Sequence, residues 1–295
     1  MTGLTRRARL AAIGLAMMVC CQAACAPPPG TALEQLVEAR SLAARLLLGM
    51  ARVGEASNRA VMSGSDEASS TAANDARQAL TMVERDAASL GTLLGSLRYT
   101  HEQDLLTEFK QRFDEYRKLN DTILGLAVQN TNLKAQQLSF GPAQDAARSF
   151  ASALESIRPS RPAETWQVRA HAATALAALR EIEVLHGPHI AEAEATAMTR
   201  LEQSMKEAES TARRALNELG KLTNTATAAE VAKASAALDR FMTLNAEIVR
   251  LSRANSNVHS LALSLGQTRR LLAACDESLQ SLELGLNSRR LGPSR

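Results

Sequence analysis

The chain has 295 residues, of which 45% are hydrophobic and only 3% aromatic, and its formal net charge is +3 at pH 7. Three arginines within residues 1–24 account for that charge, because this segment contains no acidic residue. A neutral remainder with so few aromatic rings excludes both a basic surface for phosphates and a base-stacking platform, so we expect no nucleic-acid partner.

The N-terminus has the pattern of an export signal. Residues 1–9 are basic, and residues 10–21 form an apolar run that is too short to span a bilayer. We therefore predict that residues 1–24 are a signal peptide and that the protein is exported.

The segment Gln22-Ala23-Ala24-Cys25 resembles the lipobox of bacterial lipoproteins, although Gln22 departs from its usual leucine. This resemblance implies lipidation at Cys25, with residues 25–30 as a proline-rich tether. The anchored protein would then lie on the periplasmic face of the outer membrane. Cleavage at an A-x-A site around Ala24 is the alternative.

The chain repeats itself at an offset of 125 residues. Residues 114–157 align without a gap to residues 239–282, with 12 identities. Asparagines recur in the pattern: Asn120, Asn130 and Asn132 meet Asn245, Asn255 and Asn257. This indicates that the protein is built twice from one helical unit.

Apolar residues follow three- and four-residue steps through both units, as in long amphipathic helices. The pattern predicts four helices at residues 31–98, 102–157, 163–222 and 228–287. The predicted domains are a first helical hairpin repeat (31–157), a linker (158–162), a second hairpin repeat (163–287) and a disordered tail (288–295). Gly64 and Gly187-Pro188 are expected to mark a matching kink or break in the first and third helices.

The predicted fold class is all-α. Four helices of this length favour one elongated antiparallel four-helix bundle made of two duplicated long helical hairpins. The alternative is two shorter four-helix bundles stacked end to end, with turns at Gly64, Asn130, Gly187 and Asn255. The continuous apolar stripe through both asparagines favours the first arrangement.

In the single bundle, the second and fourth helices run parallel, so Asn130 and Asn255 share one level. The expected polar layer also contains Ser69, Ser70 and Thr196. Buried asparagines commonly fix helix register at a cost in stability. That interpretation predicts that Asn130→Leu together with Asn255→Leu stabilises the protein. Exposure at a helix break and a polar ligand pocket are the alternatives.

Three histidines of the second repeat are weak metal candidates: His186, His189 and His259. Gly187-Pro188 interrupts the first pair and Lys134 replaces His259 in the other repeat, so we expect surface histidines and no metal or other cofactor. Cys275 lies at a helix-core position and is expected to be a buried, inert thiol. No catalytic motif is present, so the chain is not expected to be an enzyme.

The segment 116–127 resembles the four-helix-bundle sensor domain of methyl-accepting chemotaxis proteins, and 241–251 echoes it. The residues that carry the resemblance are Tyr116, Leu119, Asn120, Ile123, Phe241, Leu244, Asn245 and Ile248. Members of that family bind small molecules at helix interfaces. The resemblance does not extend to their transmembrane signalling parts, so we do not expect this chain to signal across a membrane by itself.

These observations lead to two functional expectations. The first is an exported, membrane-anchored, sensor-like protein that binds a small polar ligand or a helical partner in a chemotaxis or signal-transduction setting. The second is a structural or adaptor lipoprotein of the envelope without a small-molecule ligand. The expected partners are the membrane, through the lipid anchor, and a helical receptor or a second copy of the chain.

Overall fold

The computed structural model describes residues 31–222 and 225–289, and the regular elements in these ranges are helices. The all-α prediction is confirmed. None of the helices in these ranges combines the length and apolar character needed to cross a bilayer. The predicted signal peptide, the lipidation site Cys25 and the tether lie outside the described residues.

The first hairpin pairs α1 (Ala32–Met62) with α2 (Asp66–Leu97). The predicted helix at 31–98 is therefore wrong, because the chain reverses at Ser63–Ser65. Ser63 has an extended backbone, and the Ser65 side chain accepts a hydrogen bond from the Ala68 N–H, which caps α2. With so short a turn, the two helices must pack antiparallel.

The second hairpin pairs α6 (Thr165–Ala191) with α7 (Ala195–Leu222), after a short 3₁₀ segment, η2 (Pro162–Glu164). The predicted helix at 163–222 is thus also divided. The turn lies at Glu192–Glu194, where the Glu192 carboxylate accepts hydrogen bonds from two backbone N–H groups. Gly187 and Pro188, which were expected to mark the kink, lie inside α6.

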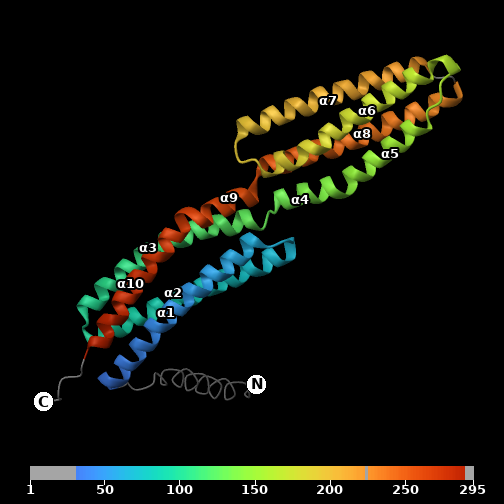
Figure 1. The fold of residues 1–295 in the computed structure, drawn as a ribbon. Coiled ribbons are helices and arrows are strands. Elements are labelled where there is room, and N and C mark those ends of the chain that lie inside the picture. The colour runs from blue at the N-terminus through green and yellow to red at the C-terminus, as the bar shows by residue number, and fades with distance from the viewer. Residues whose placement is uncertain (1–30, 223–224, 290–295) are drawn as a thin grey trace, which may run out of the picture.

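Two further helical runs extend through the whole molecule (Figure 1). Each passes through a break at a repeated asparagine and a π-helical segment, where one residue is inserted into the helix. The first run comprises α3 (Thr100–Ala127), α4 (Thr131–Leu138), η1 (Ser139–Ala143) and α5 (Gln144–Ser156). The second comprises α8 (Thr225–Ala254), α9 (Ser256–Leu263), η3 (Ser264–Thr268) and α10 (Arg269–Ser288).

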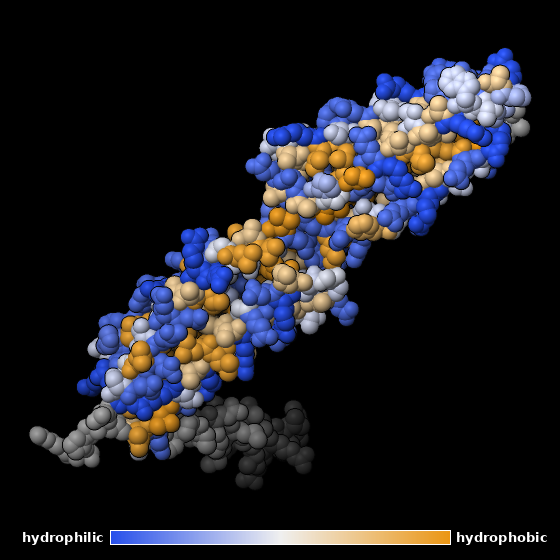
Figure 2. Space-filling model, in the orientation of Figure 1, coloured by the Kyte–Doolittle hydropathy of each residue, from blue (hydrophilic) through white to orange (hydrophobic). Residues whose placement is uncertain are grey.

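The helices form two bundles end to end, which is the alternative arrangement from the sequence (Figure 1). The first bundle contains α1, α2, α3 and α10, and the second contains α5, α6, α7 and α8. Because α3 packs on α10 and α5 on α8, the long runs are antiparallel, not parallel as expected. Figure 2 shows the same rod as a surface, with apolar side chains gathered on this face around its middle, over α9.

Separate apolar cores hold the two bundles. Phe109, Phe113 and Tyr116 fill the first core, and Phe150 and Phe241 fill the second. Each of these rings is at most 3% exposed, and burial of large apolar side chains is the main stabilising contribution in such bundles. The cores explain why each hairpin folds back onto the long runs and not onto the other hairpin.

Cys275 is buried in the first core, as predicted. Burial, together with the nearby Asp276 carboxyl, raises the pKa of its thiol to about 12. The thiolate is the nucleophilic form of cysteine, so this side chain acts as a small apolar residue in the packing.

The outer end of the first bundle is closed by Arg289. Its guanidinium donates to both carboxylate oxygens of Glu102, at 2.8 and 2.7 Å, and lies 4.6 Å from the centre of the Tyr99 ring. This hydrogen-bonded pair holds the pKa of Glu102 below its usual value. Arg289 thus has an ordered position although 288–295 was predicted to be disordered; residues 290–295 lie outside the described ranges.

The helix ends define how the hairpins correspond. Met62 and Ala191 end α1 and α6, and Asp66 and Ala195 begin α2 and α7, so both pairs are 129 residues apart. The sequence-based match of Gly64 with Gly187, which are 123 residues apart, is therefore wrong. The long runs keep the offset of 125, as the repeated asparagines show.

Candidate functional site

Asn130 and Asn255 lie where the two bundles meet. Both have a left-handed backbone, with φ of 50° and 51°, and they interrupt the long helical runs immediately before α4 and α9. Asparagine tolerates this conformation better than most residues. Both side chains are also buried, at 0% and 2% exposure. The asparagines therefore break the helices inside the protein. This combines two of the alternatives from the sequence, which were a buried asparagine pair and a break in the helix.

The first turns of α4 and α9 cap each other. The Thr131 N–H donates to Ser256 Oγ at 3.1 Å, and the Ser256 N–H donates to Thr131 Oγ1 at 3.0 Å. One residue further on, the Asn132 N–H donates to Asn257 Oδ1 at 3.1 Å, and the Asn257 N–H donates to Asn132 Oδ1 at 3.2 Å. Equivalent residues thus satisfy each other's free helix N–H groups across a local two-fold relation.

The amide groups extend this reciprocal network, which we call the polar junction: residues 130–132 and 255–257. Asn132 Nδ2 donates to Asn255 Oδ1 at 2.7 Å, and Asn257 Nδ2 donates to Asn130 Oδ1 at 3.0 Å. Paired groups of this kind make burial of so many polar atoms tolerable. The six-residue network binds the two long runs at one level.

The junction also contacts both hairpin turns. Asn130 Nδ2 donates to the Asp66 carboxylate at 2.9 Å, and Asn255 Nδ2 donates to the Glu192 carbonyl oxygen at 2.8 Å. The hydrogen bond from Asn130, followed by the one from Lys134, lowers the pKa of Asp66. All four parts of the duplicated fold therefore meet at the junction: two long runs and two hairpin ends.

The other residues predicted for the polar layer have different positions. Ser69 is buried beside the junction, where its hydroxyl oxygen lies 3.1 Å from the carbonyl oxygens of both Ala60 and Ala127. Ser70 and Thr196 are exposed. Their inclusion assumed uninterrupted antiparallel helices, and the hairpin turns change which face of α2 and α7 points inward.

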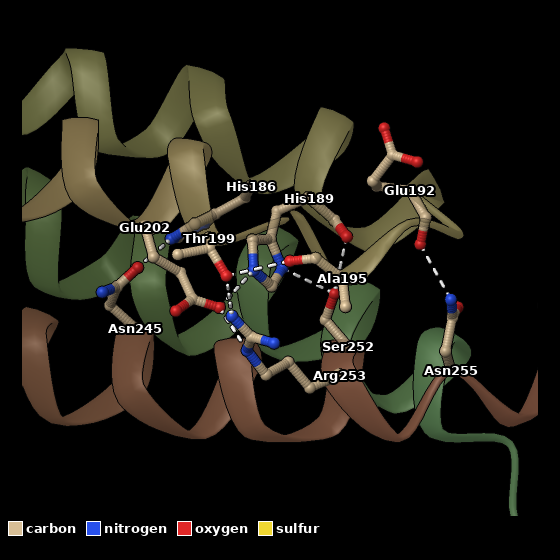
Figure 3. Close-up of polar contacts among 10 residues, drawn as sticks. All are labelled: His186, His189, Glu192, Ala195, Thr199, Glu202, Asn245, Ser252, Arg253 and Asn255. Carbon is tan, nitrogen blue, oxygen red and sulfur yellow. Dashed lines mark hydrogen bonds and ion pairs between the residues drawn. The ribbon is translucent and has the colours of Figure 1, made fainter. Parts of the chain in front are cut away.

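His186 occupies the core of the second bundle (Figure 3). Its ring lies 3.0 Å from Ser139 Oγ through Nδ1 and 2.9 Å from Asn245 Oδ1 through Nε2, and it stacks on Phe241 at a centroid distance of 5.8 Å. Since an amide oxygen only accepts, Nε2 carries the proton and the Ser139 hydroxyl donates to Nδ1. Burial lowers the pKa of His186, which keeps the ring neutral.

His189 connects α6 to two neighbouring helices (Figure 3). Its Nδ1 lies 2.7 Å from Ser252 Oγ, and its Nε2 lies 3.0 Å from a Glu202 carboxylate oxygen that also accepts from Arg253 at 2.6 Å. Burial by itself raises the pKa of Glu202, but the hydrogen bonds from Arg253 and His189 outweigh burial and leave the pKa below its usual value.

The expectation of surface histidines is wrong for two of the three. His186 and His189 are at most 1% exposed, whereas His259 is exposed on α9. Both ring nitrogens of each buried histidine contact protein groups, which leaves no free nitrogen for a metal. Within the described ranges, no group of three or more potential ligands has metal-binding geometry. The sequence signal was the spacing of three along a helix, which puts two side chains on one face.

Comparisons with known proteins give little further information. No family model and no curated protein matches the chain. Among solved structures, it is similar to the crystal structure of the TorS sensor domain–TorT complex in the presence of TMAO, at 12% identity and a TM-score of 0.34, over 88% of this chain and 100% of the other. A TM-score of this size does not establish a shared fold.

Proposed function

We propose that this protein is an exported, sensor-like helical protein that binds a small polar ligand or a helical partner and has no catalytic role. The observation that carries the proposal is the polar junction. It joins two bundles through helices that run from one to the other, so a shift of either long run in one bundle must be accommodated at Asn130 and Asn255.

The hydrogen bonds at the junction make it suited to respond to such a shift. Left-handed residues other than glycine store local strain of up to about 1–2 kcal/mol each, and asparagine stores less than most. The reciprocal hydrogen bonds between the first turns of α4 and α9 stabilise this backbone conformation, and only a few side chains form them. A small rotation of α3 or α8 would exchange these caps for water and change the relative position of the bundles.

Hydrogen exchange tests this coupling. A thermal-shift screen of the full chain with amino acids, organic acids and metal ions first identifies a compound that stabilises the protein. We then expect the backbone amides of Thr131, Asn132, Ser256 and Asn257 to change their exchange rates on binding. An amide in the middle of α7, such as that of Ala212, serves as the control. A bound compound that leaves the four junction amides unchanged would contradict the sensor proposal.

The second candidate function is a structural or adaptor lipoprotein, which the end-to-end arrangement of the bundles favours (Figure 1). A rod of this kind needs a rigid junction and no ligand. A broad panel without any stabilising compound, together with strong exchange protection at the junction, would favour this function over sensing.

A helical partner is the other form of the sensor proposal. Phe140 and Leu265 are exposed by 63% and 64%, and they occupy equivalent places in the two π-helical segments beside the junction. Apolar side chains at such positions suit contact with another helix, from a receptor or a second copy. Loss of partner capture by Phe140→Ser together with Leu265→Ser, with an unchanged melting temperature, would support this form.

Membrane anchoring through Cys25 is part of the proposal and has its own test. Wild type and the Cys25→Ala variant are expressed with labelled palmitate, with and without globomycin. We expect label only in the wild type and accumulation of the precursor with the inhibitor. Equal labelling of both proteins would exclude lipidation at Cys25.

A further inference from the structure

The first bundle contains a cavity of about 360 Å³ between α1, α3 and the η3–α10 segment. Small-molecule sites typically begin at about this size. Apolar walls come from Gly54, Ile123 and Leu272, and Asn58, Leu265 and Arg269 form an exposed rim. The cavity therefore opens to solvent at one side and reaches the core at the other.

Four residues that line this cavity carry buried polar atoms without a hydrogen-bond partner. These atoms are Ser57 Oγ, Tyr116 Oη, both amide atoms of Asn120 and Thr268 Oγ1. The exposed fractions of these four side chains are between 0% and 7%. The hydroxyls of Ser57 and Tyr116 are neighbours but form no hydrogen bond of normal geometry. An unsatisfied buried polar group costs about 1–3 kcal/mol, so a concentration of them in one cavity calls for an occupant.

The second bundle shows what fits at the equivalent place. Tyr116 and Asn120 correspond to Phe241 and Asn245 at the offset of 125, and Ser264 corresponds to Ser139. In the second bundle all three positions contact one group, the imidazole ring of His186. The ring donates to the asparagine, accepts from the serine and stacks on the aromatic ring.

The residue that corresponds to His186 in the first bundle is Ser57. Each lies five residues before the last residue of its helix, Ala191 in α6 and Met62 in α1, and both side chains are buried. Serine is too short to reach the asparagine across the bundle. The first bundle therefore keeps the polar and aromatic groups that surround an imidazole ring but lacks the ring itself.

We propose that this cavity binds a small molecule that carries a flat nitrogen heterocycle of the imidazole type and a short carboxylate arm. The ring stacks on Tyr116 and donates to Asn120 Oδ1, as His186 does with Phe241 and Asn245. Further donors and acceptors come from the unpaired hydroxyls of Ser57 and Thr268 and from the hydroxyl of Ser264. In the structure, the Ser264 hydroxyl donates to Asn58 at 3.2 Å. This inference rests on the proposed ligand-binding function and names its ligand class.

Arg269 provides the reason for the carboxylate arm. Its guanidinium is exposed at the rim of the cavity, none of the described residues that line the cavity carries a carboxylate, and the corresponding residue of the second bundle is the neutral Gln144. Guanidinium groups bind carboxylates through two parallel hydrogen bonds. The cavity, at about 360 Å³, is larger than a single imidazole ring and therefore has room for a ring and a short arm.

Calorimetry and thermal shift of the full chain test the ligand class with three probes. We expect imidazole-4-acetate to bind and to raise the melting temperature. Cyclopentylacetate, which has nearly the same shape but no ring nitrogen, and acetate, which has only the carboxylate, are expected not to bind. Equal binding of cyclopentylacetate would overturn the proposal, because the ring nitrogens would then have no role.

Variants locate the site. Asn120→Ala should weaken binding of imidazole-4-acetate by at least about tenfold, the effect of losing one buried hydrogen bond to the ligand. Arg269→Ala should weaken imidazole-4-acetate but leave imidazole unchanged, and Arg270→Ala, on the neighbouring exposed residue, serves as the matched control. Unchanged affinity in both Asn120→Ala and Arg269→Ala would overturn the proposal.

The variant Ser57→His gives the most direct test, since it supplies the missing ring from the protein itself. We expect a higher melting temperature without ligand and no binding of imidazole-4-acetate. Retained binding in this variant would overturn the proposal. So would a wild-type structure in which ordered water alone contacts Asn120 and Tyr116 at saturating concentrations of the probe.

The same measurements separate this inference from the proposed function. If other compounds of the broad panel stabilise the protein and change exchange at the junction while the imidazole series has no effect, the ligand class is wrong and the sensor proposal stands. If imidazole-4-acetate binds but the junction amides do not respond, the cavity assignment stands and the sensor proposal is wrong.

Discussion

The two bundles have nearly the same polar and aromatic framework but use it differently. Asn120 and Asn245 are buried at equivalent positions, yet only Asn245 has a partner, His186. The first bundle has serine where the second has histidine, at the same place in α1 and α6, and the cavity beside Ser57 lies where the second bundle has the imidazole ring. The difference teaches that a duplicated fold can fill a polar core position with its own side chain in one copy and leave the equivalent position unfilled in the other.

The largest expected effect comes from opening the second bundle. His186→Ser removes the stacked ring and leaves Asn245 and Ser139 without partners, which should lower the free energy of unfolding by about 3–5 kcal/mol. Denaturant unfolding measures it, with Ser57→Ala as the matched control, expected to be nearly neutral. Added imidazole should restore part of the loss. A loss in His186→Ser no greater than in Ser57→Ala would show that the two sites do not differ as described.

The second prediction concerns the junction that both bundles share. Asn130→Leu together with Asn255→Leu should destabilise the protein by about 2–4 kcal/mol, because leucine disfavours a left-handed backbone and cannot replace the amide bonds. This reverses the expectation from the sequence. Asn130→Gly together with Asn255→Gly keeps the backbone favourable and should lose less. A higher melting temperature in the double leucine variant would contradict the left-handed geometry.

The third prediction compares the outer ends of the rod. At the outer end of the second bundle, residues 157–164 join α5 to α6 covalently, whereas at the outer end of the first bundle the contact of Arg289 with Glu102 holds the end of α10 on α3. Arg289→Ala should cost about 1–2 kcal/mol, because it leaves the Glu102 carboxylate, 1% exposed, without its guanidinium partner. Thermal unfolding is the measurement, and Arg270→Ala is the exposed control. Equal melting temperatures for the two variants would show that Arg289 is not a clamp.

The smallest effect is a pH dependence that belongs to the second bundle. Burial puts the pKa of His186 below 6.5 in the folded state, so the unfolded chain takes up the proton first. The stability from His186 is therefore complete above pH 6.5 and decreases as the pH falls through the folded pKa. His186→Gln, which cannot titrate, should flatten the melting temperature between about pH 7 and about pH 5. Identical pH profiles would contradict this assignment.

Much of the fold follows from local sequence. Apolar spacing along 102–157 and 228–287 predicts the long runs nearly to their ends, and the repeated asparagines predict the duplication. The turn at Ser63–Ser65 was expected only in the alternative arrangement, at Gly64, and the turn at Glu192–Glu194 was expected at Gly187, five residues too early; the capping side chains of Ser65 and Glu192 mark the two turns. A chain reversal between two amphipathic helices is hard to detect from the spacing of apolar residues alone, because that spacing is the same on both sides of the turn.

The candidate site could be predicted only in part. Repetition singled out Asn130 and Asn255, because a polar pair recurring on an apolar face needs a reason. Ser57 could not be found in this way, since its equivalent, His186, differs in residue type and lies at another offset. The cavity exists because a side chain is absent from the core. Such an absence can be recognised only when the positions of the surrounding residues are known.

The sequence by itself determined that this protein is helical and duplicated, because helical period and repetition are local properties of the chain. Only the tertiary structure decided that equivalent residues meet at the centre, that the asparagines are left-handed and capped across the junction, and that the place of the His186 ring is filled in one bundle and unfilled in the other. These features depend on contacts between residues more than 50 positions apart. Such contacts are set by the packing of whole helices, which no short segment encodes.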